Sequence, residues 1–380
     1  MKVSIIEPVG SHGGMDYYDF GLCSGLAKAG VEISLYTCDE TRIKNGGSLE
    51  IVFAYQRIFG GQSKWLRGAR YIKGTLHSLI KSRIEGVRIC HFHFFHVGIL
   101  ELFNVIMAKI LRMRVVITAH DVETFVSKLP VPGLVRLCYS FGDRIVAHNR
   151  WSEGELLDKV GVPQQKISII PHGNYVRSLG QVPDKLVARN QLGIQRSGKV
   201  LLCFGQIKKV KGLDLLLNAL PEVIERHPDT ILVIAGKVWK DDYSRYKRII
   251  EKYGLGPYCI EKIQYIPNEE VALYYAAADL VVLPYRRIYQ SGVLLMAMSY
   301  GKPVLASDLE GMKEIVRDNQ TGFLFETGNI KSLSDRLNDI LSDSTKMTRV
   351  ASSGYDLIRT EFSWKRVGAM TAECYESLCL

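Results

Sequence analysis

Short apolar runs alternate with longer amphipathic stretches along most of the chain, and such alternation is typical of parallel βαβ units. The apolar runs are rich in Val, Ile and Leu and end at Gly, Pro or a polar residue. A first series comprises KVSIIEP, VEISLYT, RVVITAH and RIVAH, and a second comprises KVLLCFG, TILVIAG, CIEKIQYI, LVVLPY and PVLAS. Two such series predict an α/β protein with two doubly wound halves.

The junction between the halves is predicted in the stretch 177–199. Strand-like periodicity lapses there, while Gly, Pro and polar residues cluster. We therefore expect one domain over 1–178 and a second over 195–361. The last segment, 362–378, has the pattern of a helix.

The segment YQSGVLLMAMSYGKPV, residues 289–304, places a small turn directly before an apolar helix. Ser291 can cap that helix, and Gly292 lets a ligand approach the backbone. The free N–H groups of the first helical turn, with the helix dipole behind them, favour an anion such as phosphate. An ordinary capped helix of an α/β domain is the alternative interpretation.

A second anion-binding candidate is the loop FGQIKKVKG, residues 204–212, which joins a predicted strand to a predicted helix. Its three lysines, Lys208, Lys209 and Lys211, follow the carboxyl end of the strand, the edge where open α/β sheets bind ligands. Lysines in a loop are also commonly just solvated charge. Together with the Ser291 turn, the loop predicts a site for a diphosphate.

His120 and Asp121 follow the run VVIT, at the carboxyl end of a predicted strand of the first half. An imidazole or a carboxylate there can take the proton from a reacting hydroxyl group. A loop histidine bonded to its neighbours is the alternative, and His172, in IIPHG, has an equal claim to a structural role.

The order of these motifs resembles that of GT-B glycosyltransferases of glycosyltransferase family 4. The resemblance rests on a glycine turn after the first strand (Gly13 and Gly14), the Gly205–Gly212 loop, the run ADLVVLPY (278–285) and the closing Gly-Lys-Pro-Val. It covers nearly the whole chain. It implies two Rossmann-like domains that face each other across a cleft, with 362–380 crossing back onto the N-terminal one.

The resemblance also implies roles for the two domains. The N-terminal domain would bind the acceptor, with His120 and Asp121 near the donor sugar, and the C-terminal domain would bind a nucleotide-diphosphate sugar without a metal or other cofactor. The donor-binding residues that it implies are Gly205, Lys208, Lys211, Tyr289, Gln290, Ser291, Gly292 and Val293.

Three positions depart from the family pattern. The two glutamates of the family signature fall on Ile288 and Met296, and the arginine of its glycine loop falls on Gln206. Variant signatures of this type resemble those of enzymes that build bacterial exopolysaccharides and lipopolysaccharides. The departures leave open whether the product retains or inverts the anomeric configuration.

The net charge of +10 calls for an acidic partner. The stretch 57–83 contains many Lys and Arg residues and no Asp or Glu, with Trp65, Leu66 and Ile80 among them. A basic amphipathic helix of this kind can lie on an anionic membrane surface, although a packed helix with a solvated basic face is the alternative. No nucleic-acid-binding module accompanies the charge.

Histidines and cysteines do not form an evident metal site. The run HFHFFH (91–96) has no acidic or Cys partner nearby, so metal binding is not expected there. The eight cysteines lack close pairing and predict buried thiols in a reducing compartment. With no signal-peptide pattern and no apolar run of about 18 residues, a cytoplasmic protein is expected.

The sequence thus predicts a glycosyltransferase, peripheral at the inner face of the plasma membrane, that transfers a hexose-type sugar to a lipid-linked oligosaccharide during bacterial surface polysaccharide synthesis. A sugar-nucleotide 2-epimerase of the same fold and a catalytically inactive sugar-nucleotide-binding subunit remain alternatives. The nucleotide base, the sugar, the acceptor, the linkage and the oligomeric state are left open.

Overall fold

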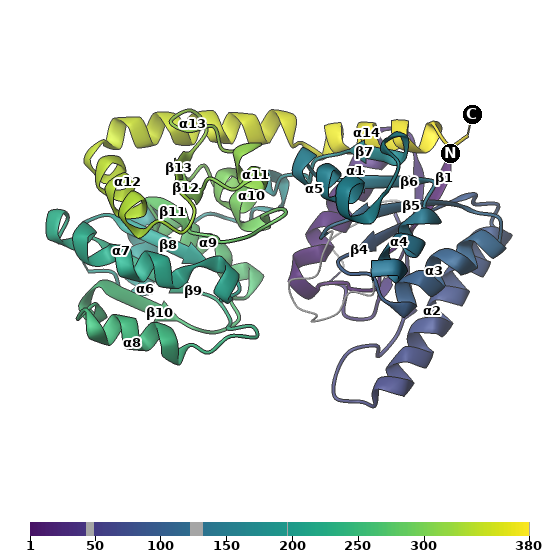
Figure 1. The fold of residues 1–380 in the computed structure, drawn as a ribbon, viewed down its shortest axis with the longest axis horizontal. Helices are drawn as coiled ribbons and strands as arrows, with labels where there is room; N and C mark the ends of the chain where they lie inside the picture. The colour runs from purple at the N-terminus through teal and green to yellow at the C-terminus, as the bar shows by residue number, and fades with distance from the viewer. Residues whose placement is uncertain (43–48, 122–131, 196, 380) are drawn as a thin grey trace. The chain divides into compact units, whose positions relative to one another are not determined.

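The computed structural model describes residues 1–42, 49–121, 132–195 and 197–379. The chain divides into two compact units, Met1–Gly173 with Phe362–Leu380, and Asn174–Glu361. Each unit is built on one parallel β-sheet (Figure 1).

The first unit contains a seven-stranded sheet in the order β3-β2-β1-β4-β5-β6-β7. Its strands run parallel, and β1 lies between β2 and β4. They are β1 (Lys2–Ile6), β2 (Glu32–Cys38), β3 (Glu50–Tyr55), β4 (Ile89–Phe94), β5 (Arg114–Ala119), β6 (Arg144–Ala147) and β7 (Ile167–Ile169).

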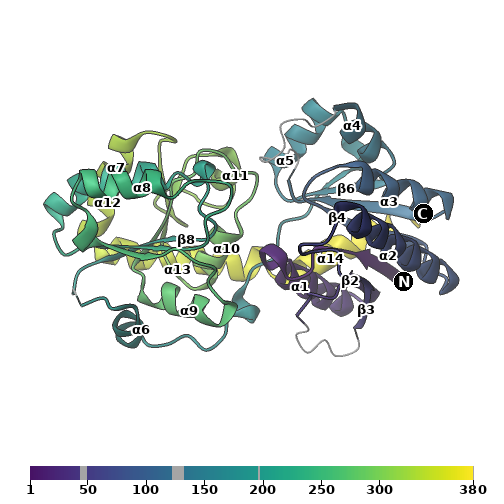
Figure 2. The same ribbon diagram turned by 90° about the horizontal axis from the view of Figure 1, so that it is seen from below.

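Helices cover both faces of the first sheet, as a doubly wound fold requires (Figure 2). Helices α1 and α14 pack together on one face, and α2 and α3 pack together on the other. The helices of this unit are α1 (Met15–Lys28), α2 (Lys64–Ile84), α3 (Ile99–Ile110), α4 (Pro132–Ser140), α5 (Arg150–Glu155) and α14 (Trp364–Glu376), with the short turns η1 (His12–Gly14), η2 (Leu156–Val160) and η3 (Gln164–Lys166).

Helix α14 joins the first unit through very close contact with α1. A Cβ atom added to Gly25 would lie 2.0 Å from the carbonyl oxygen of Trp364, and one added to Gly368 would lie 2.1 Å from the backbone of Gly25. Only glycine permits this approach of the two backbones. The aromatic ring of Trp364 fills the space beside Gly21 and Gly173.

The second unit contains a six-stranded parallel sheet in the order β10-β9-β8-β11-β12-β13. A continuous apolar core lies between the sheet and the helices that cover it, including Leu216, Leu232 and Leu333. The strands are β8 (Val200–Phe204), β9 (Ile231–Ala235), β10 (Cys259–Lys262), β11 (Leu280–Leu283), β12 (Val304–Ser307) and β13 (Phe323–Phe325).

The helices of the second unit also lie on both sides of its sheet (Figure 2). Helix α7 packs against α8 and α12, whereas α10 packs against α13. The helices are α6 (Lys185–Leu192), α7 (Leu213–Arg226), α8 (Ser244–Lys252), α9 (Asn268–Ala277), α10 (Gly292–Ser299), α11 (Glu310–Lys313), α12 (Ile330–Ser342) and α13 (Ser344–Glu361), with the 3-10 turns η4 (Val176–Ser178), η5 (Lys209–Lys211) and η6 (Gly256–Tyr258).

The strands predicted from the apolar runs are confirmed in both units. Four strands lie outside the two predicted series. Three of them, β3, β7 and β13, lie at sheet edges and are short or partly exposed, whereas the buried strand β4 lies between β1 and β5. The unit boundary also differs from the expected one: it lies at Gly173, and 174–194 belong to the second unit. The reason is that α6 in this stretch packs on α9 of the second unit.

The structure describes the surroundings of the cysteines and the apolar character of the helices. All eight cysteines are free thiols, but Cys379 is exposed, whereas Cys23, Cys38 and Cys90 are buried as expected. Within the described ranges, no helix combines the length and the apolar character needed to span a membrane.

Candidate active site

The direction in which the chain builds the second sheet changes between β8 and β11. From β8 the chain continues to β9 and β10 on one side, and from β11 it continues to β12 and β13 on the other. The two strands are hydrogen-bonded neighbours. Ligands of open α/β sheets bind at such a switch point, outside the carboxyl ends of the strands.

The loop after β8 is shaped by two glycines in left-handed conformations. Gly205 has a φ of 103° and Gly212 a φ of 65°. A Cβ on Gly212 would lie 1.8 Å from the carbonyl oxygen of Pro284, just beyond β11. The glycines thus let this loop pass directly against the segment that follows the neighbouring strand.

The lysines of the loop differ in their surroundings. Lys211 places its Nζ 3.7 Å from the centre of the Tyr285 ring, and Tyr285 is buried just after β11. An ammonium group over an aromatic face is held there by the ring quadrupole. Lys208 is half-buried, and Lys209 is exposed. Lys211 is therefore the loop cation most firmly placed at the switch point.

Ser291 caps α10, as the sequence predicts. The backbone N–H of Leu294 donates to Ser291 Oγ at 3.2 Å, and Ser291 is buried. A Cβ on Gly205 would lie 3.1 Å from Val293 in the first turn of α10, so the glycine loop and this helix start are in contact. The structure brings together the two segments that the sequence singles out as anion-binding candidates.

The remaining predicted donor-binding positions line or support this turn. Gly292 begins α10, and a Cβ there would lie 3.0 Å from the hydroxyl group of Tyr175. Tyr289 is buried within the turn, where its hydroxyl accepts a hydrogen bond from Arg287 at 3.2 Å, and Gln290 is half-buried. The Tyr289 side chain thus supports the turn from inside.

Arg286 is a residue of this region that the sequence analysis did not identify. It forms a two-pronged ion pair with Asp214 at the start of α7, with both N–O distances 2.7 Å. Its backbone N–H donates to the carbonyl oxygen of Val210 at 2.8 Å. Arg286 thereby ties the lysine loop to the segment after β11, a role that only the adjacency of β8 and β11 reveals.

The residues to which the resemblance assigns the two family glutamates, Ile288 and Met296, are half-buried. Ile288 precedes the Ser291 turn, and Met296 lies in α10. Neither side chain can accept a hydrogen bond in the way a carboxylate does. A ribose that binds near α10 must therefore be held by other groups.

In the first unit, the switch point lies between β1 and β4. Glu7 follows β1 and is completely buried, and its carboxylate oxygens accept the N–H groups of Val9 at 2.7 Å and Gly10 at 2.8 Å. Gly13 lies in η1, and Gly14, with a φ of 81°, precedes α1. Glu7, which shapes the start of this glycine turn, was not predicted as part of the site.

Five buried histidines gather beneath the carboxyl edge of the first sheet, and Tyr18 of α1 lies edge-on to four of them. Burial lowers the pKa of His93 and of His148 to about 4 and that of His172 to about 3, and it holds the pKa of His91 and His120 well below the usual value. These imidazoles are therefore neutral at neutral pH.

Two buried carboxyl groups complete this cluster. Asp19 Oδ1 lies 3.1 Å from His93 Nδ1, and both side chains are fully buried. Burial raises the pKa of Glu7 and of Asp19 well above the usual value. Repulsion from Asp19 further raises the pKa of Glu7, and repulsion from Asp16 further raises that of Asp19. Glu7 and Asp19 therefore favour their protonated forms.

His120 directly follows β5, as the sequence predicts, and its ring is buried. Phe95 stacks on the ring with centroids 4.5 Å apart, and His148 Nε2 lies 3.3 Å from His120 Nδ1. Asp121 is half-buried at the next position. Segment 122–131, which follows, is outside the described residues.

Family comparisons agree with this arrangement. A sequence profile described as "Glycosyltransferase Family 4" matches residues 12–174, and one described as "Glycosyl transferases group 1" matches residues 184–356. The chain is a glycosyltransferase similar to those of family 4. The family-4 profile begins after β1 and Glu7 and includes β4 and His120, whereas the group 1 profile includes both strands of the second switch point, β8 and β11.

Two sequence relatives show how the similarity is distributed. The glycosyltransferase is 29% identical to spore coat protein SA of Bacillus subtilis (strain 168) over 50% of this chain and 51% of that protein. It is 24% identical to the D-inositol 3-phosphate glycosyltransferase of Corynebacterium aurimucosum over 99% of this chain and 94% of that protein.

Solved structures show the same fold. HepE from Anabaena, crystallised in complex with UDP, superimposes with a TM-score of 0.78 over 99% of this chain and 100% of that one, at 18% sequence identity. The GT-B architecture predicted from the sequence is therefore confirmed for the glycosyltransferase: two α/β Rossmann-like domains with parallel sheets.

Strand β4 of the glycosyltransferase contains His91 and His93, the first two histidines of the run HFHFFH. His91 bonds to Tyr375 and Thr118, each at 2.7 Å, and His93 lies beside Asp19. In the part of the chain that the structure describes, no group of three or more His, Cys, Asp or Glu side chains is placed to hold a metal ion.

Proposed function

We propose that this glycosyltransferase transfers a hexose-type sugar from a nucleotide-diphosphate sugar to a lipid-linked oligosaccharide in bacterial surface polysaccharide synthesis. The observation that carries the donor part is the contact between the Gly205–Gly212 loop and the start of α10. This contact gathers a lysine and the free N–H groups of a capped helix at one switch point, which suits a diphosphate.

The leaving diphosphate gains negative charge as the glycosidic bond breaks. Lys211 beside Tyr285 and the N–H groups that follow Ser291 would neutralise this charge in a site that needs no metal ion. Lys208 would add a second cation. The complex of HepE with UDP supports a nucleoside diphosphate as the ligand of the corresponding fold.

The acceptor would react at the first unit. Asp121, at the end of β5, is the group that we assign as general base for the acceptor hydroxyl. His120 is less suited to that task, because burial holds its pKa well below neutrality and a weak base abstracts protons poorly. The sequence analysis left both residues as candidates, and the lowered pKa of His120 supports the choice of Asp121.

The membrane part of the proposal rests on α2, whose faces are arranged in an unusual way. The face turned toward the sheet carries Gly74, Thr75, Ser78, Leu79 and Ser82. Several of its large apolar side chains are instead exposed to solvent: Trp65 by 91%, Ile84 by 81%, Ile80 by 47% and Leu66 by 46%. An apolar outer face on a basic helix suits the interfacial region of a membrane.

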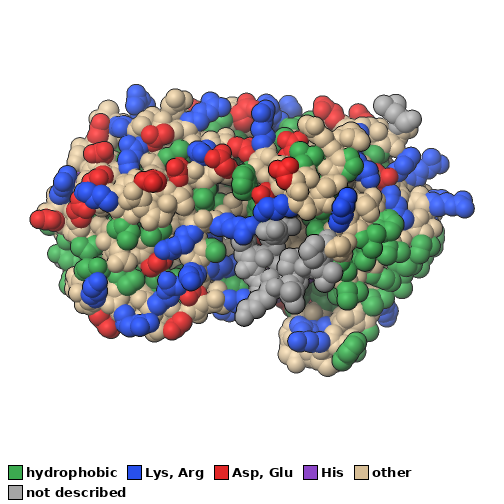
Figure 3. All heavy atoms as spheres, viewed as in Figure 1, with side chains coloured by type: hydrophobic (Ala, Val, Ile, Leu, Met, Phe, Trp, Pro, Cys, Tyr) green, Lys and Arg blue, Asp and Glu red, His purple; other side chains and the backbone are tan. Residues whose placement is uncertain are grey.

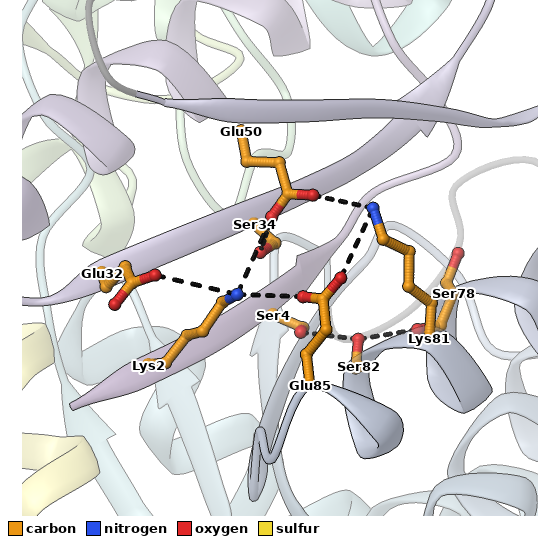
Figure 4. A network of polar contacts seen from close by, with 9 residues as sticks. All are labelled: Lys2, Ser4, Glu32, Ser34, Glu50, Ser78, Lys81, Ser82 and Glu85. Atoms are coloured by element: carbon orange, nitrogen blue, oxygen red, sulfur yellow. Dashed lines mark hydrogen bonds and ion pairs between the residues drawn. The ribbon is translucent and has the colours of Figure 1, made fainter.

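The inward face of α2 is held by polar contacts (Figure 4). Ser82 receives a hydrogen bond from Ser4 of β1 at 2.7 Å and donates to the carbonyl oxygen of Ser78 at 2.6 Å. Lys81 pairs with Glu50 at 2.7 Å and with Glu85 at 3.6 Å. These contacts fix which side of α2 faces outward. Exposed cations earlier in the helix, such as Lys73, can then interact with anionic lipid headgroups.

The neighbouring helix extends the apolar surface. Helix α3 packs beside α2 and exposes Ile99 by 78% and Ile110 by 64%. Figure 3 shows hydrophobic side chains gathered over α3, with blue basic side chains around them. A surface of this composition supports docking at the inner, anionic face of the plasma membrane, where a lipid-linked acceptor would be presented.

A relative that aligns over almost the whole chain suggests a second acceptor class. That protein is named a D-inositol 3-phosphate glycosyltransferase. A soluble polyol phosphate is therefore the alternative to the lipid-linked oligosaccharide. The apolar outer face of α2 favours the lipid-linked acceptor, because a soluble acceptor gives such a face no role.

The function is tested by measuring nucleoside diphosphate release from UDP-, GDP- and ADP-sugars with a lipid-linked oligosaccharide, with inositol phosphate and with no acceptor. We expect release that depends on the lipid-linked acceptor. Release that depends on inositol phosphate would identify inositol phosphate, and not a lipid-linked oligosaccharide, as the acceptor. Conversion of the sugar without release would indicate an epimerase, and donor binding without turnover would indicate an inactive partner subunit.

A further inference from the structure

A chain of hydrogen bonds runs beneath the carboxyl edge of the first sheet, through three segments that are far apart in sequence. His148, which follows β6, has its Nδ1 3.0 Å from the carbonyl oxygen of Ile170. The Nε2 of the same ring lies 3.3 Å from Nδ1 of His120, which follows β5. All three residues are buried.

The chemistry of the carbonyl group sets the direction of this chain. A carbonyl oxygen can only accept, so His148 Nδ1 must carry the hydrogen. A neutral imidazole carries one hydrogen, so His148 Nε2 must be an acceptor. His120 Nδ1 must then donate to it, and no hydrogen remains for His120 Nε2.

We propose that His148 is a positioning residue that fixes the tautomer of His120, so that His120 presents an unprotonated Nε2 as a hydrogen-bond acceptor. The carbonyl oxygen of Ile170 fixes the tautomer of His148, which follows β6. His148 in turn fixes the tautomer of His120, which follows β5. Charge does not disturb the relay near neutral pH, because burial keeps the pKa of both imidazoles low.

The position of His120 Nε2 explains why a defined tautomer matters. The atom is buried and has no hydrogen-bond partner among the described residues, and such an acceptor is costly unless a ligand satisfies it. Phe95 stacked on the ring and Tyr18, whose ring centroid lies 4.8 Å away, hold the imidazole plane in place. The acceptor is therefore built to receive an O–H group.

The identity of that group rests on the proposed function: it would be a sugar hydroxyl. The opposite tautomer would carry a hydrogen on Nε2 and would select a carbonyl or phosphate oxygen instead. His148 thus determines the kind of group that His120 accepts, although His148 itself need not touch the sugar.

Two amide substitutions at position 148 separate the two ends of the relay. In His148→Gln, the side-chain amide reaches the place of Nε2 and can still accept from His120. In His148→Asn, the shorter amide reaches the place of Nδ1 and can bond to Ile170, but it leaves His120 Nδ1 without an acceptor. Both replacements are polar and neutral, so they form a matched pair.

The tautomer is read from the ring nitrogens of the whole protein labelled with ¹⁵N-histidine, without any substrate, by long-range ¹H–¹⁵N correlation spectra near neutral pH. A spectrum of His120→Gln identifies the signals of His120. We expect His120 to carry its hydrogen on Nδ1 in the wild type and in His148→Gln, and to shift toward the Nε2-protonated form, which free histidine favours in water, in His148→Asn.

A hydrogen on His120 Nε2 in the wild type overturns the inference, as does an unchanged tautomer in a folded His148→Asn. Circular dichroism and the signals of His91 and His93 report whether each variant is folded. Because the spectra need no sugar, they stand apart from the proposed function. If the protein released no nucleoside diphosphate from any donor, the assignment of a sugar hydroxyl as the partner of His120 would be wrong. The tautomer result would still stand.

Discussion

Lys211 is the single residue on which the proposed diphosphate site depends most. Its Nζ is held over Tyr285, next to the start of α10, whereas Lys209 of the same loop is exposed. We expect Lys211→Ala to weaken nucleoside diphosphate binding by about 1.5 to 3 kcal/mol, the usual worth of a hydrogen bond to a charged group. Titration calorimetry with UDP, GDP and ADP measures the loss.

Lys209→Ala is the matched control for Lys211→Ala, because it removes the same charge from the same loop. We expect it to change the affinity by only a few tenths of a kcal/mol, as screened surface charges do. Equal losses for both variants would mean that the loop attracts the anion by its total charge and that Lys211 makes no specific contact.

Residues with local roles could be predicted from the sequence, and residues with distant partners could not. Ser291 was found because an N-cap needs only the residues of its own helix turn. Arg286 and His148 were missed because their partners, Asp214 and His120, come from neighbouring strands or loops. No spacing along the chain reveals such pairs before the strand order is known.

Among the elements, α2 shows where hydrophobic patterning misleads. Sequence patterns assign the apolar side of a helix to the core. In α2 the inward side is largely small and polar, because Thr75 bonds to Tyr55 and Asn104, while Ser82 bonds to Ser4. The stretch was predicted as an amphipathic helix, but which of its sides meets the sheet follows from these distant hydroxyl and amide partners.

The exposed apolar side chains of α2 give the membrane proposal a direct test. We expect the double substitution Trp65→Ser and Ile84→Ser to weaken binding to anionic phosphatidylglycerol vesicles several-fold or more, because both side chains are largely exposed and would lose their burial in the interface. Sedimentation with vesicles measures the bound fraction.

The second unit supplies the control for this substitution. Trp239 and Ile330 are also exposed, by 43% and 39%, and Trp239→Ser with Ile330→Ser makes the same chemical change outside the first unit. This control should bind vesicles like the wild type. A wild-type protein that does not bind anionic vesicles, or equal losses in both double variants, would contradict docking through α2.

At the scale of the whole molecule, the two sheets could be predicted because most of their central strands are continuous apolar runs. The boundary between the units was less predictable, since it depends on which sheet the stretch 174–194 packs against. The return of 362–380 to the first unit depends on Gly25 and Gly368, whose role appears only once α1 and α14 are in contact.

Titratable groups are also divided unevenly between the units. His227 is the only histidine of the second unit, whereas the first holds the buried cluster of His91, His93, His120, His148 and His172. A buried histidine with a lowered pKa takes up a proton on unfolding at any pH between its folded and unfolded pKa values. Acid should therefore affect the two units differently.

We expect the first unit to lose stability as the pH falls from about 6.5 toward about 4, and to unfold before the second unit. Below the unfolded pKa of 6.5, the unfolded state binds protons that the folded imidazoles exclude, since the folded pKa is about 4 for His93 and His148 and about 3 for His172. Each such proton lowers the free energy of unfolding by about 1.4 kcal/mol per pH unit. Glu7 and Asp19 act in the opposite sense, because their raised pKa values let the folded state keep protons that the unfolded state releases, but the five imidazoles outnumber them.

The order of unfolding can be followed by urea titrations at pH 7 and pH 5, with hydrogen-exchange pulses at one fixed pH and peptides assigned to each unit. The midpoint for peptides of the first unit should fall more steeply between the two pH values than that for peptides of the second. His148→Gln removes one of the titrating imidazoles. The difference between the midpoint shifts of the two units should therefore decrease by the contribution of about one proton. Midpoints that fall in parallel for both units would contradict this prediction, because the buried imidazoles of the first unit would then add nothing to its acid sensitivity.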